Sequence, residues 1–190
     1  MDKMTICVYG AASDKIASSF IAQSEKLGEE IARRHHSMIY GGGGGGVMGA
    51  CARGAARTGG KVIGVVPYFM DAFEVINKNC TKIIRTDTMS ERKDVMEDHA
   101  DAFIIAPGGI GTFDEFFQIL TLVELGQKPA PIAIYNIDGY YDDLLAFMEV
   151  CTRKGFIRER ALTLFRVCST AQETVDAVEE MYRAMQQNRS

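Results

Sequence analysis

The 190-residue sequence contains no tryptophan, only four prolines and only three histidines. His35, His36 and His99 do not stand at metal-ligand spacing from any cysteine. The five cysteines lie far apart and form no Cys-x-x-Cys pair, which is typical of reduced, mostly buried thiols. We therefore expect no disulfide framework, no metal site and no bound metal cofactor.

Long hydrophobic runs and an excess of positive charge are also missing. No apolar run approaches the roughly 20 residues that span a bilayer, and the chain passes from Met1 into a strand-like segment without a signal peptide. The net charge of -4 argues against a polymeric nucleic acid as partner, whereas a small phosphorylated molecule needs only local positive charge. We expect a cytoplasmic protein that binds neither membranes nor polymeric nucleic acid.

Segments with strand and helix patterns alternate along the whole chain, and no repeat or internal linker interrupts them. Short apolar runs predict strands at 5–9, 37–40, 62–66, 81–85, 102–106, 131–135 and 163–167. Helical periodicity or start signals predict helices at 16–34, 47–58, 90–99, 113–125 and 141–154, and one from Thr170. This alternation predicts a single α/β domain over residues 1–190, a Rossmann-like parallel sheet with helices on both faces.

The stretch from 102 to 117 carries the strongest functional signal. A buried strand stops at Pro107, and three glycines, Gly108, Gly109 and Gly111, then allow a sharp turn without a Cβ in the way. Thr112 can cap a helix that begins at Phe113. A strand, a glycine turn and a helix N-terminus present backbone N–H groups and the helix dipole to one point, which favours a bound phosphate.

Glu115 lies one turn into that helix, where a carboxylate could face whatever carries the phosphate. The structural alternative is a capping box, in which Glu115 only satisfies the N–H of Thr112. Asp114 is a rival carboxylate, but neighbouring helix positions diverge by about 100°, so we expect only one of the two to face a pocket.

Two cations, Arg92 and Lys93, stand near the start of the helix at 90–99, where the helix dipole disfavours them. This placement suggests a bound anion, and a solvated pair of surface charges is the alternative. After the first strand, Ser13 and Asp14 either contact a ligand or cap the next helix, and we favour the cap.

Six consecutive glycines, 41–46, follow the second strand. No Lys-Ser/Thr follows them, so they are not a Walker A loop, and the strand at 62–66 lacks the acidic residue that would hold a dinucleotide ribose. Their position inside a compact domain argues for close approach to a ligand rather than for a flexible linker.

Pro107-Gly-Gly-Ile-Gly-Thr-Phe-Asp-Glu115 resembles the Pro-Gly-Gly-x-Gly-Thr-x-x-Glu motif of the LOG family, which comprises cytokinin riboside 5′-monophosphate phosphoribohydrolases. The glycine segment 41–49, the segment 89–93 and the segment 136–141 are similar to further motifs of that family, in the same order. Ser90 departs from the family's usual histidine, and the first loop reads Tyr-Gly-Ala-Ala-Ser rather than Cys-Gly-Ser-Ser. The connection at 127–129 is short, and the family's tryptophan is missing.

The resemblance implies catalytic roles for Arg92 and Glu115 and a homodimer with active sites near the subunit interface. It implies a substrate pocket to which the following residues contribute: Ser13, Gly43, Gly46, Met48, Glu74, Lys93, Gly108, Gly109, Ile110, Gly111, Thr112, Asp114 and Thr121. The apolar helix segment 116–125 also favours a second subunit, because it needs cover on several sides.

The predicted reaction is hydrolysis of the N-glycosidic bond of a purine nucleoside 5′-monophosphate, with AMP and N6-substituted AMP left open as substrates. Lysine decarboxylation needs a pyridoxal phosphate Schiff base, and no lysine stands beside the phosphate turn in a suitable context. The alternatives are a non-catalytic nucleotide or molybdenum-cofactor carrier, which needs the glycine turn but not the carboxylate, and a phosphotransferase. The missing Walker lysine and Mg²⁺ carboxylate cluster weigh against the phosphotransferase.

Overall fold

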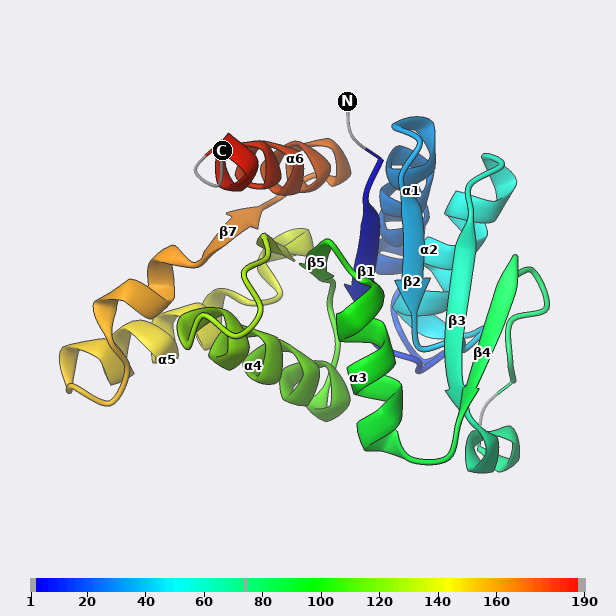
Figure 1. Ribbon diagram of the computed structural model, residues 1–190, viewed down its shortest axis with the longest axis horizontal. Coiled ribbons are helices and arrows are strands. Elements are labelled where there is room, and N and C mark those ends of the chain that lie inside the picture. Colours follow the sequence, from blue (N-terminus) through cyan, green and yellow to red (C-terminus); the bar gives the residue numbers. More distant parts are fainter. Residues whose placement is uncertain (1–2, 74, 188–190) are drawn as a thin grey trace.

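The computed structural model describes residues 3–73 and 75–187, which form a seven-stranded parallel sheet in the order β4-β3-β2-β1-β5-β6-β7 (Figure 1). The strands are β1 (Thr5–Tyr9), β2 (Ser37–Tyr40), β3 (Val62–Pro67), β4 (Lys82–Thr86), β5 (Ala102–Ile105), β6 (Ile132–Tyr135) and β7 (Phe165–Cys168). Short apolar runs in which every residue is buried, such as that of β5, are expected of strands covered on both faces.

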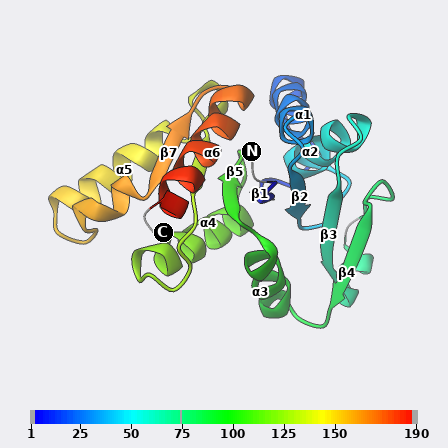
Figure 2. The same ribbon diagram turned by 45° about the horizontal axis from the view of Figure 1, so that its top comes forward.

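Helices cover both faces of this sheet, as Figures 1 and 2 show. On one face lie α1 (Ser18–Arg33), α2 (Gly46–Arg57) and α6 (Ala171–Gln187), and on the other α3 (Met89–His99), α4 (Ile110–Glu124) and α5 (Asp142–Arg153). Within the described residues, three short 3-10 helices lie in the connections: η1 (Tyr68–Ala72) between β3 and β4, η2 (Ile137–Gly139) between β6 and α5, and η3 (Glu159–Thr163) between α5 and β7. The predicted Rossmann-like α/β fold is confirmed.

Side chains of β1 alternate between the two hydrophobic layers. Ile6 and Val8 pack in the layer with α1, α2 and α6, whereas Cys7 and Tyr9 pack in the layer with α3, α4 and α5. The last residue of β1 therefore faces the helices that carry Arg92 and Glu115.

The topology opens a crevice at the end of β1. This strand pairs with β2 on one side and with β5 on the other, so the connections after β1 and β5 lead to opposite faces of the sheet. Tyr9 and Ile105 are partners at the ends of their strands, which brings the loops after them together.

Two predicted helix starts are wrong. Helix α4 begins at Ile110 with Gly109 at its N-cap position, so Thr112 lies inside the helix and caps nothing. Helix α3 begins one residue before Ser90, because Thr88 and Glu91 form a reciprocal capping box there.

The predicted cap of the first helix is also wrong. Helix α1 begins at Ser18, and the Ser13 hydroxyl instead accepts a hydrogen bond from the N–H of Lys15. The Asp14 carboxylate accepts one from the N–H of Gly46, the first residue of α2. Asp14 thus binds the start of α2, 32 residues further along the chain, and not the start of α1, the next helix in sequence.

Within residues 3–73 and 75–187, no helix has the length and apolar character to cross a membrane. In the same residues, no three His, Cys, Asp or Glu side chains gather in a way that could hold a metal ion.

Candidate active site

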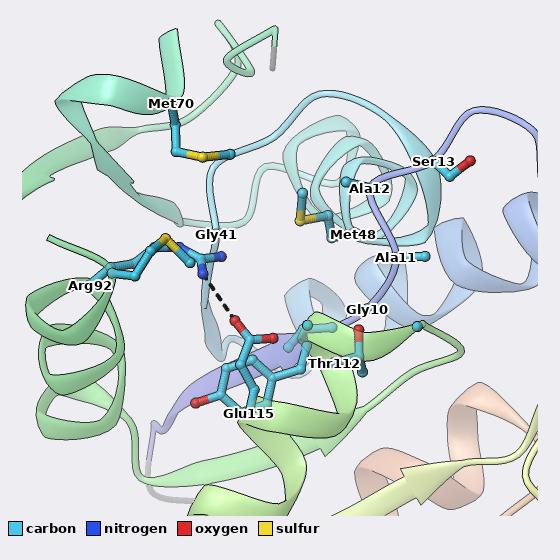
Figure 3. Close-up of a pocket in the computed structure, with 15 residues that line it drawn as sticks. Gly10, Ala11, Ala12, Ser13, Gly41, Met48, Met70, Arg92, Thr112 and Glu115 are labelled. Atoms are coloured by element: carbon cyan, nitrogen blue, oxygen red, sulfur yellow. Dashed lines mark hydrogen bonds and ion pairs between the residues drawn. The ribbon is translucent and has the colours of Figure 1, made fainter. Parts of the chain in front are cut away.

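The crevice at the ends of β1 and β5 contains a cavity of about 350 Å³ (Figure 3). Loops after β1, β2 and β5 form its floor, and the first turns of α3 and α4 form one side. Its lining residues are Val8, Tyr9, Gly10, Ala11, Ala12, Ser13, Gly41, Met48, Met70, Met89, Arg92, Gly109, Gly111, Thr112 and Glu115.

The glycine turn leaves the start of α4 open toward this cavity. A Cβ added at Gly109 or Gly111 would meet no atom within 4 Å, and no side chain caps the helix. The first-turn N–H groups of an α-helix have no acceptor within the helix, so here they are available to a ligand. Gly108 differs, because a Cβ there would collide with the Thr112 side chain. The arrangement suits an anion held by backbone N–H groups.

Three successive carbonyl groups of the turn are fixed from outside. Tyr141 donates its hydroxyl hydrogen to the Ala106 carbonyl at 2.8 Å, and Tyr140 donates to the Gly108 carbonyl at 2.7 Å. Between them, the N–H of Ala11 donates to the Pro107 carbonyl at 3.0 Å. With its carbonyls engaged in this way, the turn is held in one orientation before any ligand arrives.

Arg92 and Glu115 meet at the edge of the cavity. Arg92 Nη1 lies 3.1 Å from Glu115 Oε1, and Arg92 Nε donates to the Val65 carbonyl at 3.3 Å. Figure 3 shows the two side chains pointing toward one another from α3 and α4. The side chains are only 12% and 10% exposed. Gly41 leaves room beside them, because a Cβ there would overlap the guanidinium and displace it.

Burial raises the pKa of Glu115 to about 7. The charge and hydrogen bond of Arg92 oppose this rise without cancelling it, Asp114 adds to it, and Lys93 weakly opposes it. A carboxyl group with a pKa near neutrality can exchange a proton at physiological pH, which is the property that acid–base catalysis requires. The capping-box interpretation of Glu115 is wrong, because its carboxylate accepts from Arg92 instead.

A second ion pair joins α3 and α4 outside the cavity. Lys93 Nζ lies 3.0 Å from Asp114 Oδ2, and the Asp114 side chain is 59% exposed. Of the two adjacent carboxylates, Glu115 therefore faces the cavity and Asp114 faces away, as their spacing predicted. The interpretation of Arg92 and Lys93 as a solvated pair is wrong, since each has a carboxylate partner on α4.

The cavity brings together seven of the sequence-predicted residues: Ser13, Met48, Arg92, Gly109, Gly111, Thr112 and Glu115. The predicted residues Lys93, Gly108 and Asp114 do not line it. Ile110 is 84% exposed, and Thr121 donates its hydroxyl hydrogen to the Phe117 carbonyl one turn earlier in α4. Glu74 lies outside the described residues.

The glycine run fits closely against the protein itself. Gly43 accepts a hydrogen bond from the Tyr40 hydroxyl, and Gly46 has a φ of +59° and packs on the backbone of residues 11–13. A Cβ at Gly45 would collide with Asp14 and the Ala12 carbonyl. Of the six glycines, Gly41 alone lines the cavity. Gly44, Gly45 and Gly46 are therefore glycine because neighbouring backbone approaches them, whereas Gly41 leaves room for Arg92.

Sequence reasoning missed Met70 and Met89, which line the cavity with Met48. Met70 belongs to η1, where a lone methionine gives no signal of a site. Met89 belongs to the first turn of α3 and opens the motif-like segment 89–93, but that resemblance gave it no role of its own. The sequence pattern also indicated no role for Tyr9, the last residue of β1.

Comparison with known proteins adds an independent result. Residues 48–178 match the family described as "possible lysine decarboxylase". Over 175 residues the chain is 35% identical to cytokinin riboside 5′-monophosphate phosphoribohydrolase LOG4 of Arabidopsis thaliana, covering 92% of this chain and 81% of the relative. It is also 35% identical to LOG of Oryza sativa subsp. japonica, covering 92% of this chain and 72% of the relative.

The fold also resembles a solved structure, that of the molybdenum cofactor carrier protein of Chlamydomonas reinhardtii, with a TM-score of 0.71 and 22% identity over 95% of this chain and 98% of that one. A likeness at this identity concerns the fold alone. The sequence relatives, the matched family and the order of the motifs around the cavity agree, and the chain belongs to the LOG family.

Proposed function

We propose that this protein hydrolyses the N-glycosidic bond of a purine nucleoside 5′-monophosphate, releasing the free base and ribose 5-phosphate. The observation that carries the proposal is the buried Arg92–Glu115 pair, which borders the same cavity as the open N-terminus of α4. The names of the LOG relatives support this reaction and include a cytokinin riboside 5′-monophosphate as substrate. A carrier would need the phosphate turn but has no use for a buried carboxylate with a pKa near 7.

The phosphate is the anchor of the proposed mechanism. It binds the N–H groups at the start of α4, beside Gly109, Gly111 and Thr112, with the loop at Ser13 on the other side. Because the phosphate is remote from the bond that breaks, its binding energy serves to place the ribose in the reactive orientation.

Glu115 acts at the other end of the ribose. As the C1′–N bond breaks, C1′ gains positive charge, which the Glu115 carboxylate stabilises. The oxygen of a water molecule forms the new bond to C1′ as its proton passes to Glu115, which later releases it to solvent; the departing base takes up a proton from solvent. Arg92 does not donate that proton, since a guanidinium stays charged. It instead steadies the negative charge that grows on the leaving base or contacts the substrate phosphate.

The requirement for phosphate gives a direct test. We expect the protein to release adenine from AMP, and adenosine to react at least about a hundredfold more slowly, because it lacks the anchor. Chromatography of the products from both substrates measures this. Equal rates with AMP and adenosine would refute the phosphate anchor, and intact AMP that remains bound would favour the carrier.

The pH dependence of kcat/KM follows from the state of Glu115 in the free enzyme. Because the working form is the carboxylate and its pKa is about 7, kcat/KM for AMP should rise with pH through neutrality and level off above it. Replacing Arg92 by Gln should move this rise to higher pH, since the Arg92 charge lowers the pKa of Glu115. Initial rates from about pH 5 to pH 9 report both curves. An acidic limb at the same pH in both proteins would contradict the assignment.

Tyr140 should affect substrate binding, because its hydroxyl fixes the glycine turn. Replacing Tyr140 by Phe removes the hydrogen bond to the Gly108 carbonyl, so we expect KM for AMP to rise several-fold and the free energy of unfolding to fall by about 1 kcal/mol. Tyr135→Phe is the matched control, because its hydroxyl donates to the Gln23 carbonyl away from the cavity. A KM that rises equally in the control would show a general loss of stability instead.

We further propose a homodimer. Helix α4 exposes the side chains of Ile110 and Phe117, and Leu125, the residue just after its end, is exposed as well. Ile110 and Phe117 are seven residues apart and therefore share one face of the helix. A second subunit would cover this face close to the cavity. Light scattering coupled to size exclusion gives the mass, and a monomer at micromolar concentration would count against the proposal.

A further inference from the structure

Among the described residues that line the cavity, Tyr9 has a buried hydroxyl that is poorly satisfied. The residue is 2% exposed, its hydroxyl makes no hydrogen bond of good geometry within the described part of the chain, and its polar neighbour is the weakly hydrogen-bonding Cys7 thiol. A buried hydroxyl with so weak a partner is costly, and such groups are rare unless they serve a purpose. The ring itself is well packed, stacked on Phe103 with 6.0 Å between the ring centroids.

The fold places Tyr9 in the same layer as the Arg92–Glu115 pair. Tyr9 is the last residue of β1, and its side chain enters the layer formed with α3 and α4, the helices that carry Arg92 and Glu115. Tyr9 and Glu115 line the same cavity. Burial and the charges of Cys7, Glu115 and Glu97 raise the pKa of Tyr9, so the phenol keeps its proton and remains a donor.

Glu115 needs a donor at one moment of the proposed reaction. In the ligand-free protein Arg92 provides it, at 3.1 Å. When the guanidinium turns to the substrate, the Glu115 carboxylate is left buried and less compensated, with Asp114 nearby and Lys93 engaged by that residue. Burial would then drive Glu115 to its protonated form, which can neither stabilise C1′ nor accept a proton.

We infer that Tyr9 is a positioning residue for the proposed hydrolysis, whose hydroxyl donates a hydrogen bond to the Glu115 carboxylate in the substrate complex. A hydrogen bond to the ionised form keeps a carboxylate ionised and fixes its rotamer. The charged and titratable groups around this contact are Arg92, Lys93 and Glu97 on α3, Asp114 on α4 and Cys7 on β1. The inference rests on the proposed function for its role in turnover, but the contact itself can be tested separately.

The test replaces Tyr9 by Phe, which keeps the ring and removes only the hydroxyl. We expect kcat for AMP to fall about tenfold with KM little changed, and the acidic limb of the kcat profile to move up by about one pH unit. The thermal midpoint should stay equal or rise, because the lost hydroxyl makes no hydrogen bond of good geometry and its polar neighbour is only the weak Cys7 thiol. Tyr135→Phe is again the control, since it removes a buried tyrosine's hydroxyl that has a partner away from the cavity. It should lower the midpoint and leave the pH profile unchanged.

A second readout does not depend on turnover. Carbon NMR of carboxyl-labelled glutamate, with Glu115→Gln for assignment, gives the pKa of Glu115 in the presence of ribose 5-phosphate. A higher pKa in Tyr9→Phe than in the parent protein supports the contact even if AMP is not hydrolysed, in which case only the proposed function fails. An unchanged pKa, or an unchanged kcat profile in an active enzyme, overturns the inference.

Discussion

Replacing Glu115 by Gln should lower kcat for AMP hydrolysis by about 10²–10⁴-fold, the usual contribution of a positioned acid–base group. The amide keeps the size of the side chain and can still accept a hydrogen bond from Arg92, but it carries no charge and cannot take a proton from water. AMP should still bind, because the phosphate anchor at the start of α4 is untouched.

The same substitution should stabilise the fold at neutral and higher pH. The pKa of Glu115 is raised in the folded protein, so the folded state holds this proton more tightly than the unfolded state. Stability from this group is therefore present at low pH and is lost as the pH rises toward 7. Gln imitates the protonated form and removes that loss, for a gain of about 1–3 kcal/mol at pH 8. Urea titrations at pH 5 and at about pH 8 measure it.

Glu97 provides the matched control for the predicted loss of kcat in Glu115→Gln. It is also a buried glutamate with a raised pKa, but it lies on α3, accepts a hydrogen bond from Gln118 and does not line the cavity. Glu97→Gln should leave kcat within a few-fold of the parent protein. A large loss of activity in both variants would show that buried charge between α3 and α4, rather than catalysis by Glu115, explains the effect.

Replacing Gly111 by Ala should lower kcat/KM for AMP on the order of a hundredfold, the cost of displacing a reacting group by about 1 Å. The added methyl meets no protein atom, and Gly111 has an ordinary helical φ, so the fold itself accepts alanine. Alanine is also the better helix former, by up to about 1 kcal/mol. The methyl group instead enters the space beside the α4 N-terminus that the phosphate needs.

A weaker affinity for the phosphate ligand without a loss of stability would distinguish a local effect on the site from a general destabilisation of the fold. Calorimetric titration with ribose 5-phosphate should show weakened binding, while the thermal midpoint stays equal or rises. Unchanged affinity for ribose 5-phosphate in a folded Gly111→Ala variant would place the phosphate elsewhere.

Much of the fold could be predicted because its signals are local. Buried strands such as Ala102–Ile105 appear as short apolar runs, and Pro107 with the following glycines marks the turn without reference to other parts of the chain. The errors also have local causes. Thr112 has the residue type of a cap, but Gly109 can take that position without a side chain, so the helix begins earlier.

The sequence predicted which residues belong to the site better than it predicted how their side chains are arranged. Glu115 and Arg92 are 23 residues apart, and no spacing rule states that their side chains meet at 3.1 Å. Arg92 drew notice because the helix dipole disfavours a cation near a helix start, and Glu115 because it follows the glycine turn by one helical turn. Tyr9 and Met70 drew none, since a strand tyrosine and a loop methionine are ordinary core residues until the topology places them around a cavity.

The most direct test of the proposed hydrolysis is a single-turnover experiment with enzyme in excess over AMP, in which adenine and ribose 5-phosphate are quantified together. The proposed hydrolysis predicts that the parent protein converts all bound AMP into equal amounts of the two products, and that Glu115→Gln binds AMP and leaves it intact. Bound but unconverted AMP in the parent protein, or equal conversion by Glu115→Gln, would contradict it.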